Sequence, residues 1–539
     1  MRAFTDLFLA LDATSRTRVK VAALAAYFRD APALDAAWAT HFLTGRKLKR
    51  LVRGVDLRAA AVDASGVPPW LFESSYEAVG DLAETIALLV PDAVAHQAHD
   101  RSLAYWVEHR IAPLAGLSPP EARAQLIDAW QQLDRHGRLV YGKLLTGAFR
   151  VGAGRELVHR ALAIVADVPT GEVAQRLIGP WTPAPNFWAY LRGHDDDAAH
   201  LVLHRPYPFM LAHPLDAKLE SLGAFQDWQV EWKWDGIRAQ LLVRADGISL
   251  WSRGEALISD AFPEIVSAAA MLPRGLALDG ELVAWLPGAE RPAPFAVLQR
   301  RLGRRKPGVS VLRTAPVIML VYDVLELAGA DLRGVTLAER RATLETVVPT
   351  TGILQPSPVL SHAQWAALPA LRLEARARGA EGLMLKRRES PYRSGRTRGD
   401  WWKWKLDPHT VDAVLMYAQA GSGRRASLYT DYTFGVWDGD ALVAFAKAYS
   451  GLDDAEIRAL DNWIRANTLE RFGPVRSVAP VQVFELAFEG IAPSPRHRSG
   501  IAVRFPRIAR WRRDKSPRDA DTLATLRAVA AGDASARDP

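Results

Sequence analysis

Apolar residues recur at spacings of three and four along the first third of the chain, which is the period of an amphipathic helix. Residues 7–11, 19–28 and 82–90 show this pattern clearly, and the last of these segments stops at a proline. Residues 118–121, Ser-Pro-Pro-Glu, combine an N-cap serine, prolines in the first turn and a glutamate at the capping-box position. The pattern therefore predicts that residues 1 to about 175 are helical.

The pattern changes twice further along the chain. Six prolines fall within residues 176–215, together with the polar tip Asp195-Asp196-Asp197, which predicts a linker that partly packs. From about residue 216, apolar and polar residues alternate with a period of two, and Asp246-Gly247 between two such runs predicts a hairpin. Further strands are expected at residues 276–278, 282–285, 317–325 and 382–386, with helices at 338–347 and 363–378. These elements predict an α+β domain that ends near residue 406.

Short strands dominate the remainder of the chain. They are expected at residues 411–417, 432–437, 442–449 and 481–488, with a helix at 453–467 between them and another at 521–531. One helix among short strands is typical of a small barrel of the OB type, although β-sandwiches share the pattern.

Composition excludes several classes of protein. The 539 residues include no cysteine, so disulfides, thiol nucleophiles and Cys-ligated zinc are excluded. Hydrophobic residues make up 49% and charged residues 24%, as in ordinary soluble proteins. No apolar run approaches the length of about 18 residues that spans a bilayer. Asp6 and Asp12 interrupt the apolar N-terminus, which therefore resembles a helix and not a signal peptide. A cytoplasmic protein without a membrane partner is expected.

The basic residues indicate where chemistry could occur. The formal net charge is +8, which suits a polyanionic partner but is a weak signal alone. Only 12 of the 68 basic residues are lysine, and arginine cannot act as an amine nucleophile because it is not deprotonated. Five of the 12 lysines lie in a few short segments: Lys233, Lys386, Lys403, Lys405 and Lys515. This concentration predicts one shared site that depends on lysine.

Lys233 lies in Glu231-Trp232-Lys233-Trp234-Asp235-Gly236-Ile237-Arg238, near the end of a predicted strand. Residues two apart in a strand face the same side, so Glu231, Lys233 and Asp235 should share one face, with both tryptophans on the other. A lysine with apolar walls and nearby cations has a lowered pKa and can serve as a nucleophile. On these residues alone, a strand with exposed charges is the better explanation.

Two carboxylates and two further lysines extend the candidate site. Glu281 follows a predicted turn at a glycine, and Glu381 precedes a buried strand; two carboxylates beside a phosphate could hold Mg²⁺. Lys403 and Lys405 share one strand face and could neutralise phosphate charge. Taken singly, each glutamate is better explained as a surface charge, and the lysine pair as an amphipathic edge strand.

Three other basic segments could contact a nucleic-acid backbone. Residues 504–515 hold six basic residues and one acid. Residues 44–50 and 143–152 are glycine-containing loops with lysine or arginine, which are suited to holding phosphates. Each loop alone is better explained as a solvated turn between helices.

Taken together and in this order, these segments resemble the motifs of the ATP-dependent DNA ligases, in the nucleotidyltransferase superfamily. Residues 233–238 match K-x-D-G-x-R, whose lysine takes AMP in that family. Residues 252–255 resemble S-R-x-G, with the glycine one place early, and 279–281 resemble D-G-E. The other matches are Tyr322-Asp323 for an aromatic that stacks on adenine, 381–386 for E-G-x-x-x-K, 403–405 for K-x-K, and 504–507 with 513–515 for the C-terminal motif. One match is weak, but seven in the right order are specific.

The resemblance implies a fold class and domains. An all-α DNA-binding domain with its linker would cover residues 1–200. An α+β nucleotidyltransferase (adenylation) domain of ATP-grasp-like type would cover 201–407, and a C-terminal β-barrel of OB-fold type would cover 408–539. Rotation of the last domain about residues 406–408 is expected between reaction steps.

The resemblance also implies the reaction. Lys233 would take AMP from ATP, with Mg²⁺ as the metal and Mn²⁺ as a substitute. AMP would pass to the 5′-phosphate of nicked double-stranded DNA, and the 3′-OH would then displace it. ATP or AMP contacts are implied for Glu231, Arg238, Arg253, Glu281, Tyr322, Lys386, Lys403, Lys405, Arg510, Arg513, Asp514 and Lys515. Metal contacts are implied for Glu281 and Glu381. DNA contacts are implied for Arg46, Lys47, Lys49, Lys143, Thr146 and Arg150.

Two alternatives accompany this interpretation. An RNA or RNA–DNA end-joining ligase would use the same lysine, although RNA ligases and capping enzymes generally lack the helical domain. A non-catalytic DNA-binding scaffold should have lost Lys233, Glu281 or Lys403, and all three are present. NAD-dependent ligases carry a four-cysteine zinc finger, which the absence of cysteine excludes. A monomer suffices for three domains around a duplex; the sequence does not indicate protein partners, or a choice among repair, replication and recombination.

Overall fold

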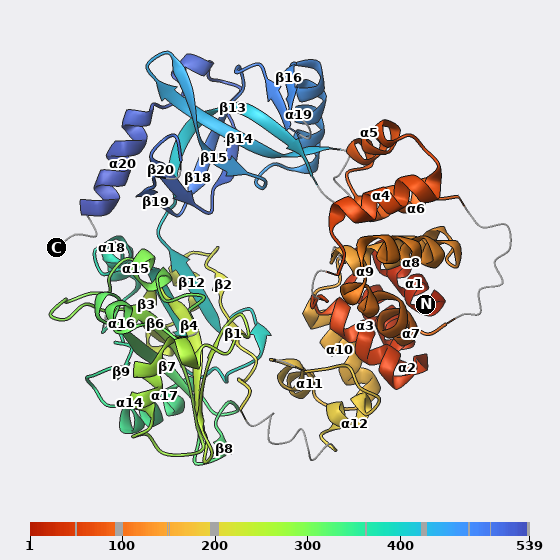
Figure 1. Cartoon of the computed structure of the whole chain (residues 1–539). Helices are drawn as coiled ribbons and strands as arrows, with labels where there is room; N and C mark the ends of the chain where they lie inside the picture. Colours follow the sequence, from red (N-terminus) through yellow and green to blue (C-terminus); the bar gives the residue numbers. More distant parts are fainter. Residues whose placement is uncertain are drawn as a thin grey trace. The chain divides into compact units, whose positions relative to one another are not determined.

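The protein was analysed as a computed structural model (Figure 1). It describes residues 1–48, 51–91, 101–147, 149, 151–179, 181–194, 204–304, 306–361, 364–421, 428–472, 475–495 and 497–535. The chain forms two compact units. The first contains Met1–Thr170, Thr182–Arg192 and Pro408–Ala531, and the second contains Gly171–Trp181, Gly193–Asp407 and Gly532–Pro539. No helix in the described ranges is long and apolar enough to cross a bilayer.

The N-terminal part is helical, as the periodicity predicts. Its α-helices are α1 (Arg2–Asp12), α2 (Thr17–Asp30), α3 (Ala33–Leu43), α4 (Gly54–Ser65), α5 (Pro69–Val79), α6 (Leu82–Leu89), α7 (Leu103–Tyr105), α8 (Pro119–Gln131), α9 (Arg135–Thr146), α10 (Arg155–Ala166), α11 (Thr170–Leu177) and α12 (Phe187–Arg192). Two irregular turns, Trp106–Ile111 and Ala112–Gly116, join α7 to α8. The expected capping box is formed: Ser118 N–H donates to Glu121 Oε2 at 2.9 Å. The expected linker is more ordered than predicted, because α12 lies within it.

Aromatic packing fixes one of the two basic loops to the first helix. Phe149 stacks on Phe4 with ring centroids 5.3 Å apart and meets the edge of Phe8 at 5.2 Å. Lys20, itself buried, donates from Nζ to the Val151 carbonyl at 2.9 Å. The loop after α9 is therefore held from both sides, by rings and by a buried ammonium.

The second unit is built on two main sheets. One has the strand order β2-β12-β10-β3, and the other has the order β5-β4-β6-β7-β8, with β9 also paired to β7. The strands are β1 (Met210–Leu211), β2 (His213–Pro214), β3 (Trp228–Trp234), β4 (Ile237–Val243), β5 (Ile248–Ser252), β6 (Leu276–Ala284), β7 (Val317–Leu327), β8 (Ala330–Asp331), β9 (Leu354–Pro356), β10 (Ala380–Arg387), β11 (Gly395–Arg396) and β12 (Trp401–Lys405). The helices are α14 (Pro263–Ala269), α15 (Phe295–Gln299), α16 (Val309–Thr314), α17 (Leu337–Val347) and α18 (Leu368–Glu374).

The predicted hairpin at Asp246-Gly247 joins β4 to β5 and is closed by Arg244 N–H donating to the Gly247 carbonyl at 2.8 Å. The predicted turn before Glu281 is wrong. Residues 276–284 form the single strand β6, and Gly280 lies inside it. A Cβ on Gly280 would lie 2.7 Å from the Leu320 carbonyl oxygen of β7, so this glycine allows close strand approach and does not reverse the chain.

A separate apolar core supports each sheet. Leu241, Leu278, Val321 and Leu344 belong to the core that includes residues of α14 and α17. The three tryptophans of β3 and Trp402 of β12 belong to another core, with Leu383 of β10. The long helix predicted at 363–378 is shorter in the structure: a single turn at Trp365–Ala367 runs into α18.

The C-terminal part is rich in strands, as predicted. Its elements are β13 (His409–Ala420), β14 (Tyr429–Asp438), β15 (Ala441–Ala448), α19 (Asp454–Ala466), β16 (Thr468–Phe472), β17 (Val475–Val478), β18 (Val483–Phe488), β19 (Gly490–Pro493), β20 (Ile501–Arg504), β21 (Arg507–Trp511) and α20 (Leu523–Ser535). The long strand β13 pairs with β18 through its first half and with β14 and β17 through its second half. One strand shared among three neighbours curls the sheet around its core, which includes Phe434, Leu460 and Phe484.

Candidate functional site

Lys233 lies at the end of β3, where the alternation predicted from the sequence holds. Trp232 and Trp234 are buried in the core with Val230, while Lys233 faces the opposite side of the strand. Its Nζ donates to Glu381 Oε2 of β10 at 2.5 Å. The alternation therefore turns the lysine away from the tryptophan core and toward a carboxylate from a neighbouring strand.

Glycines allow the backbone around Lys233 to pack closely. A Cβ on Gly236 would lie 2.2 Å from the Leu282 carbonyl oxygen and 2.8 Å from Glu281 Cγ. Gly382 has φ +144° beside a bulge in the β10–β3 pairing, and a Cβ there would lie 2.2 Å from the Trp404 carbonyl oxygen. Contacts this short leave no room for a side chain, so steric constraints require glycine at both positions.

Two lysines contact Glu381, and Lys403 lies among further cations. Lys405 Nζ lies 3.4 Å from Glu381 Oε2, the same oxygen that Lys233 contacts. The pKa of Lys403 is lowered by partial burial and then by the charges of Arg396, Lys405, Lys233 and Arg253. Lys403 thus lies among like charges, which favours the binding of an anion.

Glu281 completes the acidic part of the site. Its pKa is raised to about 8, chiefly by burial; Lys233 and Arg238 lower the pKa, and Asp279 and Glu381 raise it by smaller amounts. The same interactions place Glu281 near both Lys233 and Glu381. Two carboxylates are a suitable donor set for Mg²⁺ when phosphate and water supply its other ligands. A ready-made cluster of three or more metal-ligating side chains was not found among the described residues.

A buried aromatic and charged group lies on β3, β7, β10 and β12. Lys386 Nζ donates to Glu231 Oε1 at 2.9 Å, and both residues are about 1% exposed. The same Nζ lies 4.2 Å from the Tyr322 ring centroid and 4.7 Å from that of Trp401. The structure therefore brings Glu231, Tyr322 and Lys386 together.

Arg238 lies on β4, and Arg253 lies in the turn directly after β5, the strand paired with β4. Arg238 donates from Nε and Nη2 to the two oxygens of Asp279, at 3.1 and 2.7 Å, and from Nη1 to the Met210 carbonyl at 2.6 Å. Arg253 is exposed, and its backbone N–H donates to the Arg238 carbonyl at 2.9 Å. Arg238 is thus held rigidly, whereas the Arg253 side chain reaches solvent.

The predicted C-terminal residues lie on and just after β21. Arg510 lies 3.2 Å from Glu485, and Arg513 stacks over the Trp511 ring at 4.3 Å. Arg512 binds Asp514 at 2.7 Å and lowers the pKa of that carboxyl well below its usual range. Lys515 Nζ donates to Asp412 of β13 at 2.5 Å. Asp412 also accepts from Arg512, and so organises the whole motif.

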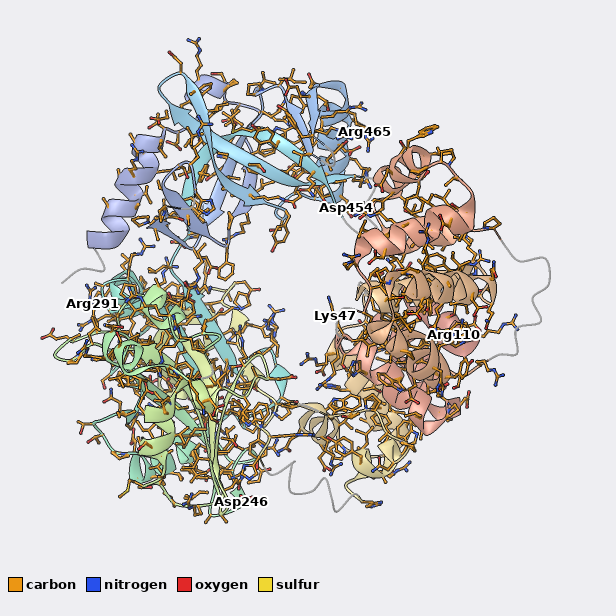
Figure 2. The ribbon with its side chains drawn as sticks, viewed as in Figure 1. Lys47, Arg110, Asp246, Arg291, Asp454 and Arg465 are labelled. Atoms are coloured by element: carbon orange, nitrogen blue, oxygen red, sulfur yellow. The ribbon has the colours of Figure 1, made fainter. Side chains whose placement is uncertain are left out.

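The two predicted DNA-binding loops lie side by side. The Lys47 side chain passes over Gly147, where a Cβ would lie 2.9 Å from Lys47 Cδ, and Arg155 Nε donates to the Thr44 carbonyl at 3.3 Å. Lys47 is exposed, and Figure 2 labels it on the loop after α3. Lys143 differs, because its Nζ pairs with Asp81 at 2.5 Å and both side chains are only 12% exposed.

Of the other loop residues, Arg46 is half-buried. Thr146 is exposed, and its hydroxyl donates to the Gly142 carbonyl at 2.9 Å. Lys49 and Arg150 lie outside the described residues.

Sequence reasoning missed three residues that hold the predicted ones in place. Tyr392 donates from its hydroxyl to Asp279 Oδ2 at 2.6 Å, and Gln229 Nε2 donates to Glu231 Oε1 at 2.7 Å. Asp412 is the third. Gln229 could have been found, because it shares a strand face with Glu231 and Lys233 at a spacing of two. No local pattern points to Tyr392 or Asp412, which act through contacts distant in sequence.

These contacts define a cationic, lysine-centred site with a buried aromatic end, a combination that suits a nucleoside triphosphate. Comparisons with known proteins identify the family. Three family models match: "DNA ligase N terminus" over residues 1–163, "ATP dependent DNA ligase domain" over 209–405 and "ATP dependent DNA ligase C terminal region" over 425–515.

Individual relatives agree with these matches. The chain is 33% identical to a probable DNA ligase of Koribacter versatilis (strain Ellin345), over 95% of this chain and 94% of that one. It is 31% identical to a probable DNA ligase of Sorangium cellulosum (strain So ce56), over 96% and 93% of the two chains. The solved structure "Pmar-Lig_PreS3" has the same fold, with a TM-score of 0.61 at 16% identity over 94% of this chain and 99% of that one. The chain belongs to the ATP-dependent DNA ligase family.

Proposed function

We propose that this ligase seals nicks in duplex DNA through an AMP adduct on Lys233. The observation that carries the proposal is the position of Lys233 Nζ, which is oriented by Glu381 at 2.5 Å, with Lys405 on the same carboxylate oxygen and Lys403 nearby. An amine that attacks a phosphate must give up a proton, which Glu381 can accept, and the neighbouring cations attract the triphosphate.

In the first step, Lys233 Nζ forms a bond to the α-phosphorus of ATP, the bond from that phosphorus to the bridging oxygen breaks, and pyrophosphate leaves. Glu381 is placed to accept the proton that Nζ releases. Lys403 and Lys405 neutralise charge on the α-phosphate. Arg510, Arg513, Asp514 and Lys515 orient the pyrophosphate in this proposal.

The base and ribose of ATP would lie toward the buried aromatic group. Tyr322 stacks on adenine, beside Lys386, and Glu231 accepts a hydrogen bond from its amino group. Arg238 and Arg253 hold the ribose or the 5′-phosphate of the nick. AMP then passes to that 5′-phosphate, and the 3′-OH attacks the same phosphorus and releases AMP. Glu281 and Glu381 would hold Mg²⁺, or Mn²⁺ in its place, which supplies charge neutralisation at the phosphates.

Three functional parts accompany this chemistry. Residues 1–200 bind DNA through Arg46, Lys47, Lys49, Thr146 and Arg150, whereas Lys143 is paired with Asp81 and acts within the fold. Residues 201–407 carry out adenylation in a nucleotidyltransferase fold, and residues 408–539 form an OB-fold. The pairing of β13 with β14, β17 and β18 supports a barrel in the last part. The DNA partner is nicked duplex, and a monomer suffices.

The test is the intact mass of the protein after incubation with ATP and magnesium. The parent should gain one AMP and lose it when nicked duplex is added. Lys233→Ala should gain nothing. Lys218→Ala removes an exposed lysine upstream of β3 and is the matched control, which should behave as the parent. An adduct on the Lys233→Ala protein, or an adduct formed from NAD in place of ATP, would contradict the proposal.

A further inference from the structure

Arg238 is held by a buried network of one carboxylate and one phenol. Asp279 is fully buried and accepts from Arg238 Nε, Arg238 Nη2 and the Tyr392 hydroxyl. Arg238 Nη2 also donates to the Tyr392 hydroxyl oxygen at 3.3 Å. With the bond from Nη1 to the Met210 carbonyl, these contacts engage four of the five N–H groups of Arg238.

Tyr392 comes from a different part of the chain than its partners. Arg238 lies on β4 and Asp279 on β6, whereas Tyr392 lies in the segment between β10 and β11. That segment is fixed, because β11 pairs with β1 at Met210 and Arg393 N–H donates to Met210 Sδ at 3.4 Å. The Tyr392 ring packs edge-on against Trp401, 5.9 Å between centroids. Ordered backbone therefore fixes the position of the Tyr392 phenol beside Asp279.

We propose that Tyr392 is a positioning residue for the ligation reaction, acting on Arg238 through Asp279. The inference rests on the proposed function, in which Arg238 holds the ribose or the 5′-phosphate. A carboxylate with one hydrogen bond on each oxygen can still rock about its Cβ–Cγ bond. The third bond, from Tyr392 to Oδ2, fixes the plane of the carboxylate and so the plane of the guanidinium that chelates it.

Burial supports the direction of this hydrogen bond. The pKa of the Tyr392 phenol is raised well above its usual value, chiefly by burial and then by the charge of Asp279. The phenol is therefore protonated and donates to the carboxylate. Arg238 lies beneath the rings of Phe209, Tyr322 and Trp401, each within 6 Å of its guanidinium carbon, so a tilt of the guanidinium would shift it against the Tyr322 ring.

A neighbouring pair provides a matched control. Arg244, the residue directly after β4, binds both oxygens of Glu326 at 3.1 and 2.8 Å, and the Tyr207 hydroxyl donates to Glu326 Oε2 at 2.7 Å. Tyr207 and Tyr392 are similarly buried, at 9% and 5% exposure. Removing either hydroxyl leaves the ring in place and takes a donated hydrogen bond from the carboxylate of a buried arginine–carboxylate pair. The Tyr392 hydroxyl also accepts from Arg238 Nη2 at 3.3 Å and from Gln240 Nε2 at 3.4 Å, and only its pair includes Arg238.

The experiment compares Tyr392→Phe with Tyr207→Phe and the parent. Three quantities are measured: the thermal midpoint, the ATP dependence of AMP-adduct formation, and the single-turnover rate of sealing on a nick that already carries AMP. Both variants should lose thermal stability, Tyr392→Phe the more, because its hydroxyl makes two further and longer hydrogen bonds. Tyr392→Phe should also raise the half-saturating ATP concentration, or slow sealing, by about tenfold, as expected for a hydrogen bond to a charged group. Tyr207→Phe should change neither.

Equal kinetics in the two variants, with an active parent, would overturn the positioning role. Slower kinetics in both, in proportion to lost stability, would overturn it as well, because that result describes a purely structural bond. If the parent itself forms no AMP adduct, the proposed function fails, and that failure is visible before the variants are compared.

Discussion

Glu255 adopts a backbone conformation that glycine normally supplies. Its φ is +63° in the turn after β5, where the ligase motif would place glycine, whereas Gly254 before it does not have a positive φ. A Cβ on Gly254 would meet nothing closer than Ser252 Oγ at 3.7 Å, so this glycine is not required by space. The turn keeps its shape, since Glu255 N–H donates to the Ser252 carbonyl at 2.9 Å. The glycine therefore lies one residue before the position with positive φ, so Glu255 is strained although the turn keeps its shape.

Glu255→Gly should relieve that strain. We expect its free energy of unfolding to be roughly 0.5–1 kcal/mol higher than that of Glu255→Ala. A left-handed conformation costs an L-residue about 1–2 kcal/mol, and the greater entropy of glycine in the unfolded chain offsets part of the stability gained by removing that cost. Glu255→Ala is the reference because it removes the same carboxylate and keeps the strain. Urea unfolding of both variants measures the difference; equal midpoints would mean that the turn is unstrained.

Individual residues of the site were predictable only where the pattern is local. The alternation along 229–234 gave the correct face for Lys233 and for Glu231. The sequence could not indicate that Asp279 would be shared by Arg238 and Tyr392, since 113 residues separate Tyr392 from Asp279. Contacts of this range depend on the pairing of strands, which periodicity does not specify.

Close strand approach, and not turn formation, accounts for the glycines of the site strands. Gly280 lies inside β6, although the sequence favoured a turn there, and Gly382 lies inside β10. A glycine flanked by polar residues predicts a turn in isolation; here each is opposed by a neighbouring strand's carbonyl oxygen less than 3 Å from where a Cβ would be. The β4–β5 hairpin was predicted correctly because its own residues specify the turn. The turn in β6 was predicted wrongly because a neighbouring strand, which the local sequence does not reveal, determines the glycine there.

Gly382→Ala should test this at the level of the strand. We expect a loss of stability of about 2 kcal/mol or more, because the new Cβ meets the Trp404 carbonyl oxygen in an already unfavourable conformation. Gly399→Ala is the matched control, since Gly399 also has a positive φ, +99°, but has no atom within 4 Å of the added Cβ. Thermal unfolding compares them, and similar losses would show that conformation alone, and not the clash, sets the cost.

Across the whole molecule, the sequence predicted the order of parts better than their internal contacts. Helices fill the N-terminal part, mixed sheets and helices the middle, and strands the C-terminal part. These regions follow from hydrophobic period alone. The sequence could not show that Lys47 and Gly147 are neighbours, because that proximity comes from packing among α1, α2, α9 and α10.

DNA binding by the whole ligase should distinguish two lysines that look alike in the sequence. Lys47→Ala should lower the slope of log affinity against log salt by about one, equally for nicked and intact duplex, because it removes one exposed cation that is proposed to contact a phosphate. Lys143→Ala should leave the slope unchanged and lower the thermal midpoint, because it breaks a half-buried pair with Asp81. Fluorescence anisotropy over a salt series measures the slopes; a reversed pattern would contradict these assignments.

The connection between β12 and β13 limits how the C-terminal part can turn. Leu406 N–H donates to the Glu381 carbonyl at 2.9 Å, and Asp407 binds Arg372 at 2.8 Å. Contacts within the middle part therefore hold both Leu406 and Asp407. His409 already pairs with Phe488 in the C-terminal sheet. Between these fixed ends lies Pro408, whose ring locks its own φ and restricts the residue before it. Very few torsions remain free here, so the expected rotation of the C-terminal part would take place about a nearly fixed axis. The fixed side of this connection is bonded to the backbone of Glu381, the residue whose carboxylate contacts Lys233.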